Sequence, residues 1–313
     1  MTEGSQQRSR FDRDVDGILL LDKRVGVTSN RALQEARTLY RAKRGGHTGS
    51  LDPLATGLLP LCFGEATKFA GHLLDSDKRY EVVAALGAAT DTGDREGEVI
   101  ATAPVPALDA TTLDAALARF LGEIEQVPPM YSALKRDGVP LYKLARRGEQ
   151  VERAARRVTI RALERVAMDR GALTLKVHCS KGTYVRTLVE DLGQALGTRA
   201  HVAELRRTAV GPFGPAGLVT AAQLASLAGD LVALDALLLP MDAGLGDHPE
   251  VRLGPDAANF FRHGQAVQSA VGAEGTVRVY GPAGFLGLAH RHRHGGIEPR
   301  RLVASPRKAP PPA

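Results

Sequence analysis

The sequence predicts an α+β fold with a mixed, largely antiparallel sheet flanked by helices, followed by a small β-rich domain. Strand-like and helix-like segments follow one another without the regular rhythm that a doubly wound parallel sheet requires. Around residues 240–250 the composition shifts to proline and glycine, and short strand-like runs follow. The 313 residues, 43% of them apolar, are enough to bury a large core and a smaller one.

We divide the chain into four parts on this basis. Residues 1–16 are polar and charged, so we expect a disordered leader, and the proline-rich residues 305–313 predict a disordered tail. Residues 17–248 are expected to form the larger domain, and residues 249–304 the smaller one.

The first elements can be assigned from local signals. Residues 17–22 (GILLLD) predict a short buried strand. Thr28 or Ser29 is suited to cap a helix, and the glycine pair at 45–46 should end it. The apolar face of this helix consists of Leu33, Ala36, Leu39 and Tyr40.

Further along, two strands and two helices are expected. Residues 80–87 (YEVVAALG) and 173–181 (LTLKVHCSK) are typical of strands, and the second alternates between apolar and polar side chains. Helices are predicted at about 111–122 and about 183–196, the latter with a continuous apolar stripe.

Composition limits the possible functions. Lys and Arg outnumber Asp and Glu by 41 to 35 and the pI is about 9.5, which favours a polyanionic partner without excluding an ordinary basic protein. Cys62 and Cys179 stand far apart, so neither a disulfide framework nor a cysteine-rich zinc site is predicted. The chain has no apolar signal segment and no uncharged run near the roughly 20 residues that span a bilayer. We therefore expect a cytoplasmic protein without a membrane anchor.

Residues 45–60 (GGHTGSLDPLATGLLP) are the most unusual stretch, and two interpretations of it stay open. Asp52 followed by Pro53 fits a helix N-cap with proline at the first helical position, the helix covering PLATGLLPL. His47 fits a hydrogen-bonded loop residue equally well. The alternative is that this cluster of glycines, hydroxyl-bearing residues, one histidine and one aspartate forms a functional site.

Eight ordered segments, within residues 17–215, resemble the TruB family of tRNA pseudouridine synthases. They are residues 21–29 (LDKRVGVTS), 47–53 (HTGSLDP), 64–68 (GEATK), 78–82 (KRYEV), 126–135 (QVPPMYSALK), 141–148 (LYKLARRG), 180–193 (SKGTYVRTLVEDLG) and 205–213 (LRRTAVGPF). Two positions depart from the family pattern: Arg24 stands where proline is usual, and Ser50 stands where threonine is usual.

The resemblance implies the pseudouridine synthase fold and a base-flipping enzyme that isomerises the uridine at position 55 in the T loop of tRNA. Such a reaction exchanges no electrons, so no cofactor or metal is expected. Asp52 resembles the family nucleophile, and Arg186 the arginine that pairs with it; an ion pair of Arg186 with Glu190 at i+4 is the alternative. Tyr80 resembles the tyrosine that stacks on the flipped uracil and is a candidate base.

The same resemblance assigns six residues to substrate binding. His47 is expected to fill the space left by the flipped base, and Tyr184 and Leu205 to line the uracil pocket, although ordinary core positions are equally open for both. Lys23, Lys43 and Arg44 are expected to contact phosphates.

Residues 249–304 resemble, more weakly, the PUA-related RNA-binding domain of bacterial members. Residues 276–280 and 285–289 predict strands there. The alternating His290, His292 and His294 should project from one side of a strand; since no neighbouring cysteine or carboxylate completes a ligand set, we expect a basic strand and no metal site.

We expect the chain to act alone, as a monomer that binds the T arm of tRNA and requires no protein partner. Two alternatives stay open: a guide-RNA-dependent pseudouridine synthase inside a multi-protein particle, and a non-catalytic protein that binds or folds tRNA and uses Asp52 only as a helix cap.

Overall fold

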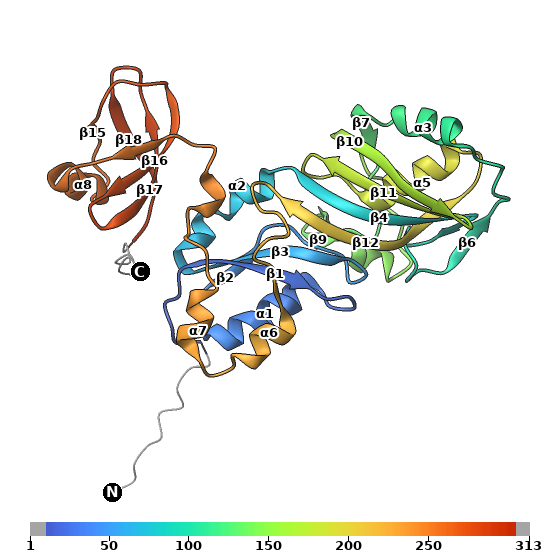
Figure 1. The fold of residues 1–313 in the computed structure, drawn as a ribbon, viewed down its shortest axis with the longest axis horizontal. Coiled ribbons are helices and arrows are strands. Elements are labelled where there is room, and N and C mark those ends of the chain that lie inside the picture. Colours follow the sequence, from blue (N-terminus) through green and yellow to red (C-terminus); the bar gives the residue numbers. More distant parts are fainter. Residues whose placement is uncertain (1–10, 305–313) are drawn as a thin grey trace, which may run out of the picture.

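The computed structural model describes residues 11–304, which form a large sheet with helices and a small sheet at one end (Figure 1). The expected tail and the first ten residues of the expected leader lie outside this range. Residues 11–16 are not loose, because Val15 is 1% exposed and Arg13 Nη2 donates to Asp235 at 2.7 Å. The predicted leader is therefore too long. In residues 11–304 we find no helix with the length and apolar character needed to cross a membrane.

The large sheet is mixed and mostly antiparallel, as the sequence predicts. Its strands are β1 (Gly17–Lys23), β2 (Gly45–His47), β3 (Thr56–Phe63), β4 (Lys78–Leu86), β7 (Gly122–Gln126), β10 (Arg156–Asp169), β11 (Ala172–Cys179), β12 (Ala200–Val210) and β13 (Val219–Thr220). The order is β13-β1-β3-β12-β4-β11-β10-β7, and β2 pairs with β3. The pairs β1–β13 and β3–β12 are parallel.

Helices cover this sheet in two groups (Figure 1). The segments are α1 (Ser29–Tyr40), α2 (Ala70–Asp75), α3 (Ala110–Ala118), α5 (Val185–Ala195), α6 (Ala221–Ser226) and α7 (Leu231–Ala236), with the 3-10 turns η1 (Gly64–Phe69) and η2 (Ala243–Leu245). Helices α1, α6 and α7 lie by β1 and β3, whereas α3 and α5 lie by β10, β4 and β12. The parallel pair β3–β12 joins the two halves.

Helix α1 begins as predicted and ends earlier than predicted. The Thr28 hydroxyl accepts a hydrogen bond from the backbone N–H of Arg31 at 3.2 Å, which satisfies one free donor of the first turn. The helix ends at Tyr40, and Arg41 adopts a left-handed conformation with φ 54°. The glycine pair at 45–46 is instead part of β2.

The alternative helix after Asp52 is wrong, because Thr56–Phe63 is the strand β3. This strand lies between β1 and β12, so most of its side chains are buried and its apolar run has no period of two. Asp52 precedes a short turn in which Ala55 N–H donates to the Asp52 carbonyl at 3.0 Å. Gly57 follows with φ 96°, and a Cβ there would lie 2.3 Å from the Arg207 carbonyl oxygen. Only glycine fits this close approach of the two strands.

The other predicted elements are present with shifted ends. The strands expected at 80–87 and 173–181 are β4 and β11, and the helices expected at 111–122 and 183–196 are α3 and α5. In β11, Leu173, Leu175 and Val177 are buried while Lys176 is exposed, which is the predicted alternation.

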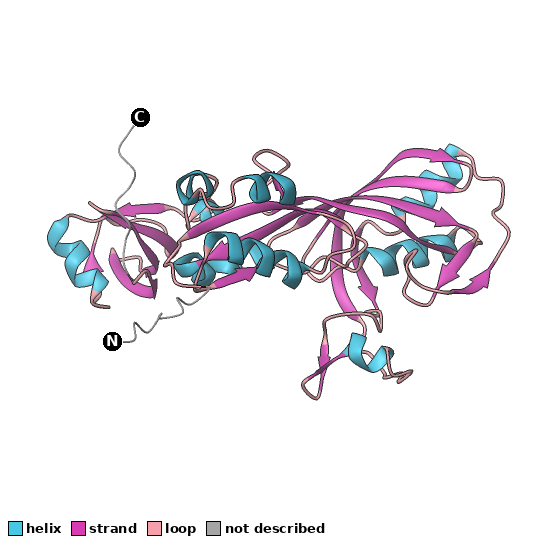
Figure 2. Cartoon of the chain, turned by 90° about the horizontal axis from the view of Figure 1, so that it is seen from below, coloured by secondary structure: helices cyan, strands magenta, loops and turns pink. Residues whose placement is uncertain are grey.

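Two additional segments are inserted between strands of the large sheet. The hairpin β5 (Ala88–Thr90) and β6 (Val99–Thr102) encloses the loop that carries Asp94. A lobe between β7 and β10 contains β8 (Lys135–Arg136), β9 (Val139–Pro140) and α4 (Leu141–Ala145), and it projects from the body in Figure 2.

The small sheet has its own core. Its elements are β14 (Glu250–Arg252), α8 (Pro255–Arg262), β15 (Val267–Gln268), β16 (Gly275–Gly281), β17 (Gly284–Arg291) and β18 (Gly296–Leu302), in the order β14-β16-β17-β18-β15. The strands expected at 276–280 and 285–289 are β16 and β17. The core is built from Val251, Phe261, Val277, Val279 and Ile297, among others. A separate apolar cluster, including Phe69, Leu245, Phe285 and Leu288, joins the small sheet to the rest of the chain.

Candidate active site

A cleft of about 550 Å³ brings together five of the predicted site residues. They come from distant parts of the chain: the loop before β3, strand β4, the start of α5 and strand β12. These residues are Asp52, Tyr80, Tyr184, Arg186 and Leu205. The remaining predicted residues, His47, Lys23, Lys43 and Arg44, are not among the residues that line this cleft.

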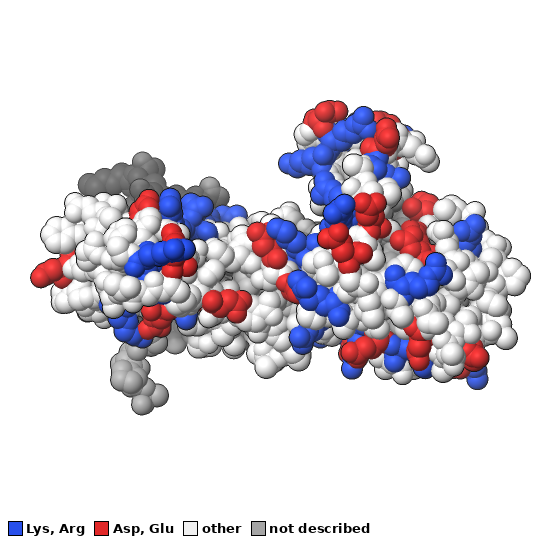
Figure 3. Space-filling model, turned by 90° about the horizontal axis from the view of Figure 1, so that it is seen from above, with Lys and Arg blue, Asp and Glu red and all other residues white. Residues whose placement is uncertain are grey.

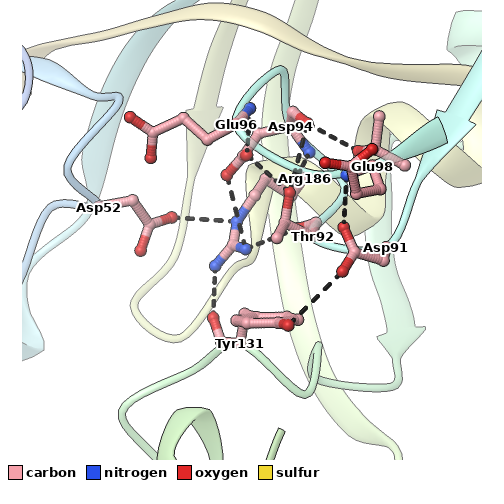
Figure 4. A network of polar contacts seen from close by, with 9 residues as sticks. Asp52, Asp91, Thr92, Asp94, Glu96, Glu98, Tyr131 and Arg186 are labelled. Atoms are coloured by element: carbon pink, nitrogen blue, oxygen red, sulfur yellow. Dashed lines mark hydrogen bonds and ion pairs between the residues drawn. The ribbon is translucent and has the colours of Figure 1, made fainter. Parts of the chain in front are cut away.

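Asp52 and Arg186 form the central ion pair of the cleft (Figure 4). Arg186 Nε lies 3.0 Å from Asp52 Oδ2. The Arg186 side chain is 5% exposed, whereas that of Asp52 is 40% exposed. The arginine is thus buried behind the carboxylate, and the carboxylate faces the open space.

Each of the three nitrogens of the Arg186 guanidinium has a polar partner. Its Nη1 donates to the Thr92 carbonyl and its Nη2 to the Tyr131 carbonyl, both at 2.7 Å. Asp94 Oδ2 lies 3.7 Å from Nη1 and balances the charge from behind. Asp94 itself accepts hydrogen bonds from the Thr92 hydroxyl at 2.7 Å and from the Glu96 backbone N–H at 3.0 Å (Figure 4). A guanidinium held this way presents one N–H to Asp52 in a single orientation.

Burial and charge act in opposite directions on Asp52. The pKa of its carboxyl is raised, because loss of water and the charge of Asp94 outweigh the nearby charges of Arg186 and Lys23, which lower it. The two cations offset part of this rise and so favour the ionised form that a nucleophile requires.

The alternative partner of Arg186, Glu190, is not used in the described structure, where Arg186 pairs with Asp52 and Asp94. Glu190 lies one turn along α5, and its carboxylate is the nearest group to the position that a Gly93 Cβ would take. Burial, with a further contribution from Asp191, raises the pKa of Glu190 to about 7.

This shift predicts a pH-dependent effect of Glu190→Gln. Because the folded chain holds the proton more tightly than the unfolded chain, wild-type stability should fall as the pH rises from about 4.5 to about 7. We expect the variant, which does not titrate, to exceed wild type at pH 8 by about 2 kcal/mol, allowing for partial solvent screening, and to match it near pH 5. Urea unfolding at both pH values measures this, with the exposed Glu149→Gln as control. An equal difference at both pH values would contradict it.

Tyr80 faces the cleft from β4 and lies opposite Arg207 on β12. Burial raises the pKa of Tyr80, while the charge of Arg207 lowers it. The net result is a phenol that is neutral at pH 7. Such a ring is well suited to stack on a planar base and poorly suited to take up a proton as a phenolate.

Tyr184 and Leu205 both line the cleft. Tyr184 caps α5, and the side-chain amide of Gln126 hydrogen-bonds to both its N–H at 3.0 Å and its carbonyl at 3.3 Å. Leu205 is 7% exposed and is part of the main core as well as of the cleft wall. For Leu205 the core and pocket interpretations are therefore compatible.

The predicted phosphate contact at Lys23 is wrong, because this side chain is 1% exposed. Its ammonium donates to the carbonyls of Val27 at 2.7 Å, Arg24 at 3.0 Å and Pro53 at 3.3 Å. Burial lowers the pKa of Lys23 to about 8. The lysine thus connects the loop after β1 to the loop that carries Asp52. Its buried ammonium already has three carbonyl partners, so it cannot reach RNA.

His47, Lys43 and Arg44 lie together on the segment between α1 and β3. His47 is half-buried at the end of β2, and burial and the charge of Arg207 lower its pKa, so the ring is uncharged near neutral pH. Lys43 is 49% exposed and pairs with Asp14 at 2.7 Å, and Arg44 is 60% exposed and lies 3.5 Å from Glu65. Both basic side chains are accessible from solvent.

The sequence interpretation did not single out Asp94 and Arg207. Asp94 is 4% exposed although it lies in the hydrophilic stretch DTGDREGE, and nothing in that composition distinguishes it from its neighbours. Arg207 is 1% exposed and donates to the carbonyls of Leu58 at 2.8 Å and Gly49 at 3.2 Å. Arg207 stands two residues after Leu205, so both side chains project to the same side of β12, and this spacing was an available signal.

Three family models match consecutive parts of the chain. Residues 37–185 match the family model described as TruB family pseudouridylate synthase (N terminal domain). Residues 186–246 match the tRNA pseudouridylate synthase B C-terminal domain, and residues 249–303 match the Pseudouridine synthase II TruB, C-terminal model.

Curated relatives are similar over almost the whole chain. A protein of Pseudomonas putida (strain GB-1) named tRNA pseudouridine synthase B is 55% identical over 303 residues, which is 96% of this chain and 99% of the relative. A protein of the same name from Chromohalobacter salexigens is 51% identical over 299 residues, covering 95% and 97%.

Among solved structures, a chain in a Cbf5-Nop10-Gar1 complex has a TM-score of 0.70 at 23% identity, covering 93% of this chain and 85% of that one. This likeness concerns the fold, and the family assignment depends on the sequence matches. On those matches, the chain belongs to the TruB family of pseudouridine synthases.

Proposed function

We propose that this enzyme converts the uridine at position 55 in the T loop of tRNA to pseudouridine, alone and without a cofactor, with Asp52 as the nucleophile. The observation that carries the proposal is the Asp52–Arg186 pair, in which a half-exposed carboxylate faces a cleft and is held at 3.0 Å by a buried arginine. The relatives named tRNA pseudouridine synthase B, at 51–55% identity, support tRNA as the substrate.

The reaction breaks the N1–C1′ glycosidic bond, rotates the uracil and forms a C5–C1′ bond, after which the proton on C5 leaves. No electrons are exchanged. Asp52 attacks either C1′ of the ribose or C6 of the uracil, since both routes require the same carboxylate at the same place. Arg186 keeps the carboxylate oriented and offsets its charge in the free enzyme.

The uridine must leave the T-loop stack to reach Asp52, and the cleft supports this step. A volume of about 550 Å³ accommodates a nucleoside, with the rings of Tyr80 and Tyr184 and the side chain of Leu205 as apolar walls. Tyr80 stacks on the flipped base; it is also the candidate base for proton removal from C5, a role that its raised pKa favours less than stacking. His47, uncharged and outside the cleft, fills the space that the base leaves.

Basic surface around the cleft is suited to the RNA backbone. Lys and Arg side chains gather on the projecting lobe in Figure 3. The segment that forms this lobe contains Lys135, Arg136, Lys143, Arg146 and Arg147. Lys43 and Arg44 supply further contacts on the segment that leads to His47. The small sheet, residues 249–304, serves as a second RNA-binding domain in this proposal, and residues 17–248 as the catalytic domain.

The phosphate role of Lys43 and Arg44 predicts a change in salt dependence. For the double variant Lys43→Ala, Arg44→Ala we expect weaker tRNA binding and a slope of log K against log salt that is shallower by about 1 to 2, because fewer counterions are released. Filter binding at several salt concentrations measures the slope. Arg170→Ala, at the turn between β10 and β11, is the control. An unchanged slope would remove these two residues from the interface.

The proposal is tested by tritium release from a T-arm stem-loop labelled at C5 of uridine, with EDTA present and no guide RNA. We expect release from the stem-loop with uridine at position 55 and none when cytidine replaces that uridine and other uridines carry the label. Release that depends on an added guide RNA would favour the guide-dependent alternative. Tight binding without release would favour the non-catalytic tRNA-binding or folding protein.

A further inference from the structure

One face of the small sheet carries two histidines and two glutamates on adjacent strands. His290 lies on β17 opposite Thr276 on β16 and opposite Glu298 on β18. His292 follows two residues later and therefore projects to the same side. Because Gly275 pairs with Arg291, Glu274 at the start of β16 comes beside His292. The topology thus places a carboxylate on each side of the histidine pair.

The side chains of these histidines and glutamates lie close together, as the strand pairing indicates. His290 Nε2 lies 3.7 Å from Glu274 Oε1, and His292 Nε2 lies 3.3 Å from Glu298 Oε2. The two imidazole rings are 4.7 Å apart. Donor atoms of Glu274, His290 and His292 all lie within 4.8 Å of one another. The sequence analysis expected no carboxylate to complete a ligand set, but the structure brings Glu274 and Glu298 beside the two histidines.

The geometry points to a binding site for a divalent transition metal ion, with zinc as the best match, made by Glu274, His290 and His292 with Glu298 as the fourth ligand. Zinc takes imidazole nitrogen and carboxylate oxygen in a tetrahedron at about 2.0 to 2.2 Å. Imidazole selects such ions over Mg²⁺ and Ca²⁺, which prefer oxygen ligands. The three strands hold the backbones in register, and the half-buried or exposed side chains would rotate to shorten the remaining distances when the ion binds.

The neighbouring arginines affect the two carboxylates differently. Arg293 Nε holds Oε2 of Glu274 at 2.8 Å, while Oε1 lies toward His290 and is left available. Arg300 Nη2 lies 3.4 Å from Oε2 of Glu298, the oxygen that also faces His292, so a metal ion there has to replace this contact. Exposed ion pairs of this kind are weak, so a bound metal ion can replace them. A carboxylate whose non-ligand oxygen accepts a hydrogen bond, as in Glu274, is better oriented as a ligand. The ion would tie together the ends of β16, β17 and β18, in a different sheet from the one that carries the cleft.

Calorimetric titration of the full, untagged chain with zinc chloride tests the site. We expect one zinc ion per chain for wild type, loss of that binding in the double variant His290→Ala, His292→Ala, and at least a tenfold weaker binding in Glu274→Gln. Zinc should raise the unfolding temperature of wild type and not that of the double variant. The matched control is His72→Ala, His248→Ala, which removes another pair of adjacent histidines, with rings 5.2 Å apart, and should keep the zinc site.

Three results would overturn the inference: no saturable zinc binding by wild type, equal binding by the double variant, or loss of binding in the control pair alone. Circular dichroism of each variant establishes that it is folded, and Glu274→Gln keeps both histidines in case their removal disturbs the hairpin. Zinc binding is measured here without RNA, so the outcome for this site is independent of the proposed catalytic function.

Discussion

Asp52→Asn should abolish turnover while leaving tRNA binding nearly unchanged. The amide has the shape of the carboxylate and can still face Arg186, but it cannot form the covalent adduct on which the proposed reaction depends. Loss of a nucleophile of this kind costs about 10⁴-fold or more in rate. We expect the single-turnover rate of pseudouridine formation to fall below the detection limit.

The matched control for this variant is Asp75→Asn. Asp75 is a carboxylate that lines the same cleft, but it is exposed and pairs with Lys181 at 2.9 Å. Its amide variant should keep the rate within several-fold of wild type. If Asp52→Asn retained more than a small percentage of the wild-type rate, Asp52 would not be the nucleophile, and the cleft would need another group for that role.

Arg186→Lys is expected to have the second-largest effect. Lysine keeps the positive charge, but one ammonium cannot donate at the same time to Asp52, Thr92 and Tyr131 as the guanidinium does. Breaking a buried, hydrogen-bonded charge network costs about 3 to 5 kcal/mol. If this cost is expressed in the barrier of the chemical step, the rate should fall by roughly 10² to 10⁴-fold.

The reduction should appear in kcat rather than in KM, since Arg186 acts on Asp52 and is too deeply buried to bind RNA. The control is Arg206→Lys, which changes an arginine that also forms a two-pronged ion pair, with Asp22 at 2.9 and 3.0 Å, outside the cleft. Near-wild-type kcat for Arg186→Lys would mean that charge alone, and not the fork geometry, orients Asp52.

Local sequence patterns predicted the elements whose surroundings are simple. Helix α1 and strand β11 each have one face against the core and one toward solvent, so their periods are visible in the sequence. Strand β3 is covered on both faces and lacks such a period, and Pro53 after Asp52 imitates a helix start. The strand could be distinguished from a helix only by its neighbours β1 and β12, which are remote in sequence.

The sequence predicted those residues of the site that the family resemblance assigned individually. Asp52, Tyr80, Tyr184, Arg186 and Leu205 do line one cleft. Lys23 was misjudged, because its burial arises from two loops that close over it. Asp94 was missed for the same reason, since the helix α5 and the Thr92 turn that bury it cannot be read from its own segment.

The parallel pairing of β3 with β12 has a consequence for synthesis of the chain on the ribosome. Asp52 precedes β3, whereas Arg186 and β12 emerge more than a hundred residues later. A nascent chain that has exposed only its first half therefore carries Asp52 without the arginine that pairs with it or the strand that completes the cleft wall. Because domains fold as their residues leave the ribosome, we expect the emerging chain to show no activity toward RNA until synthesis has passed β12.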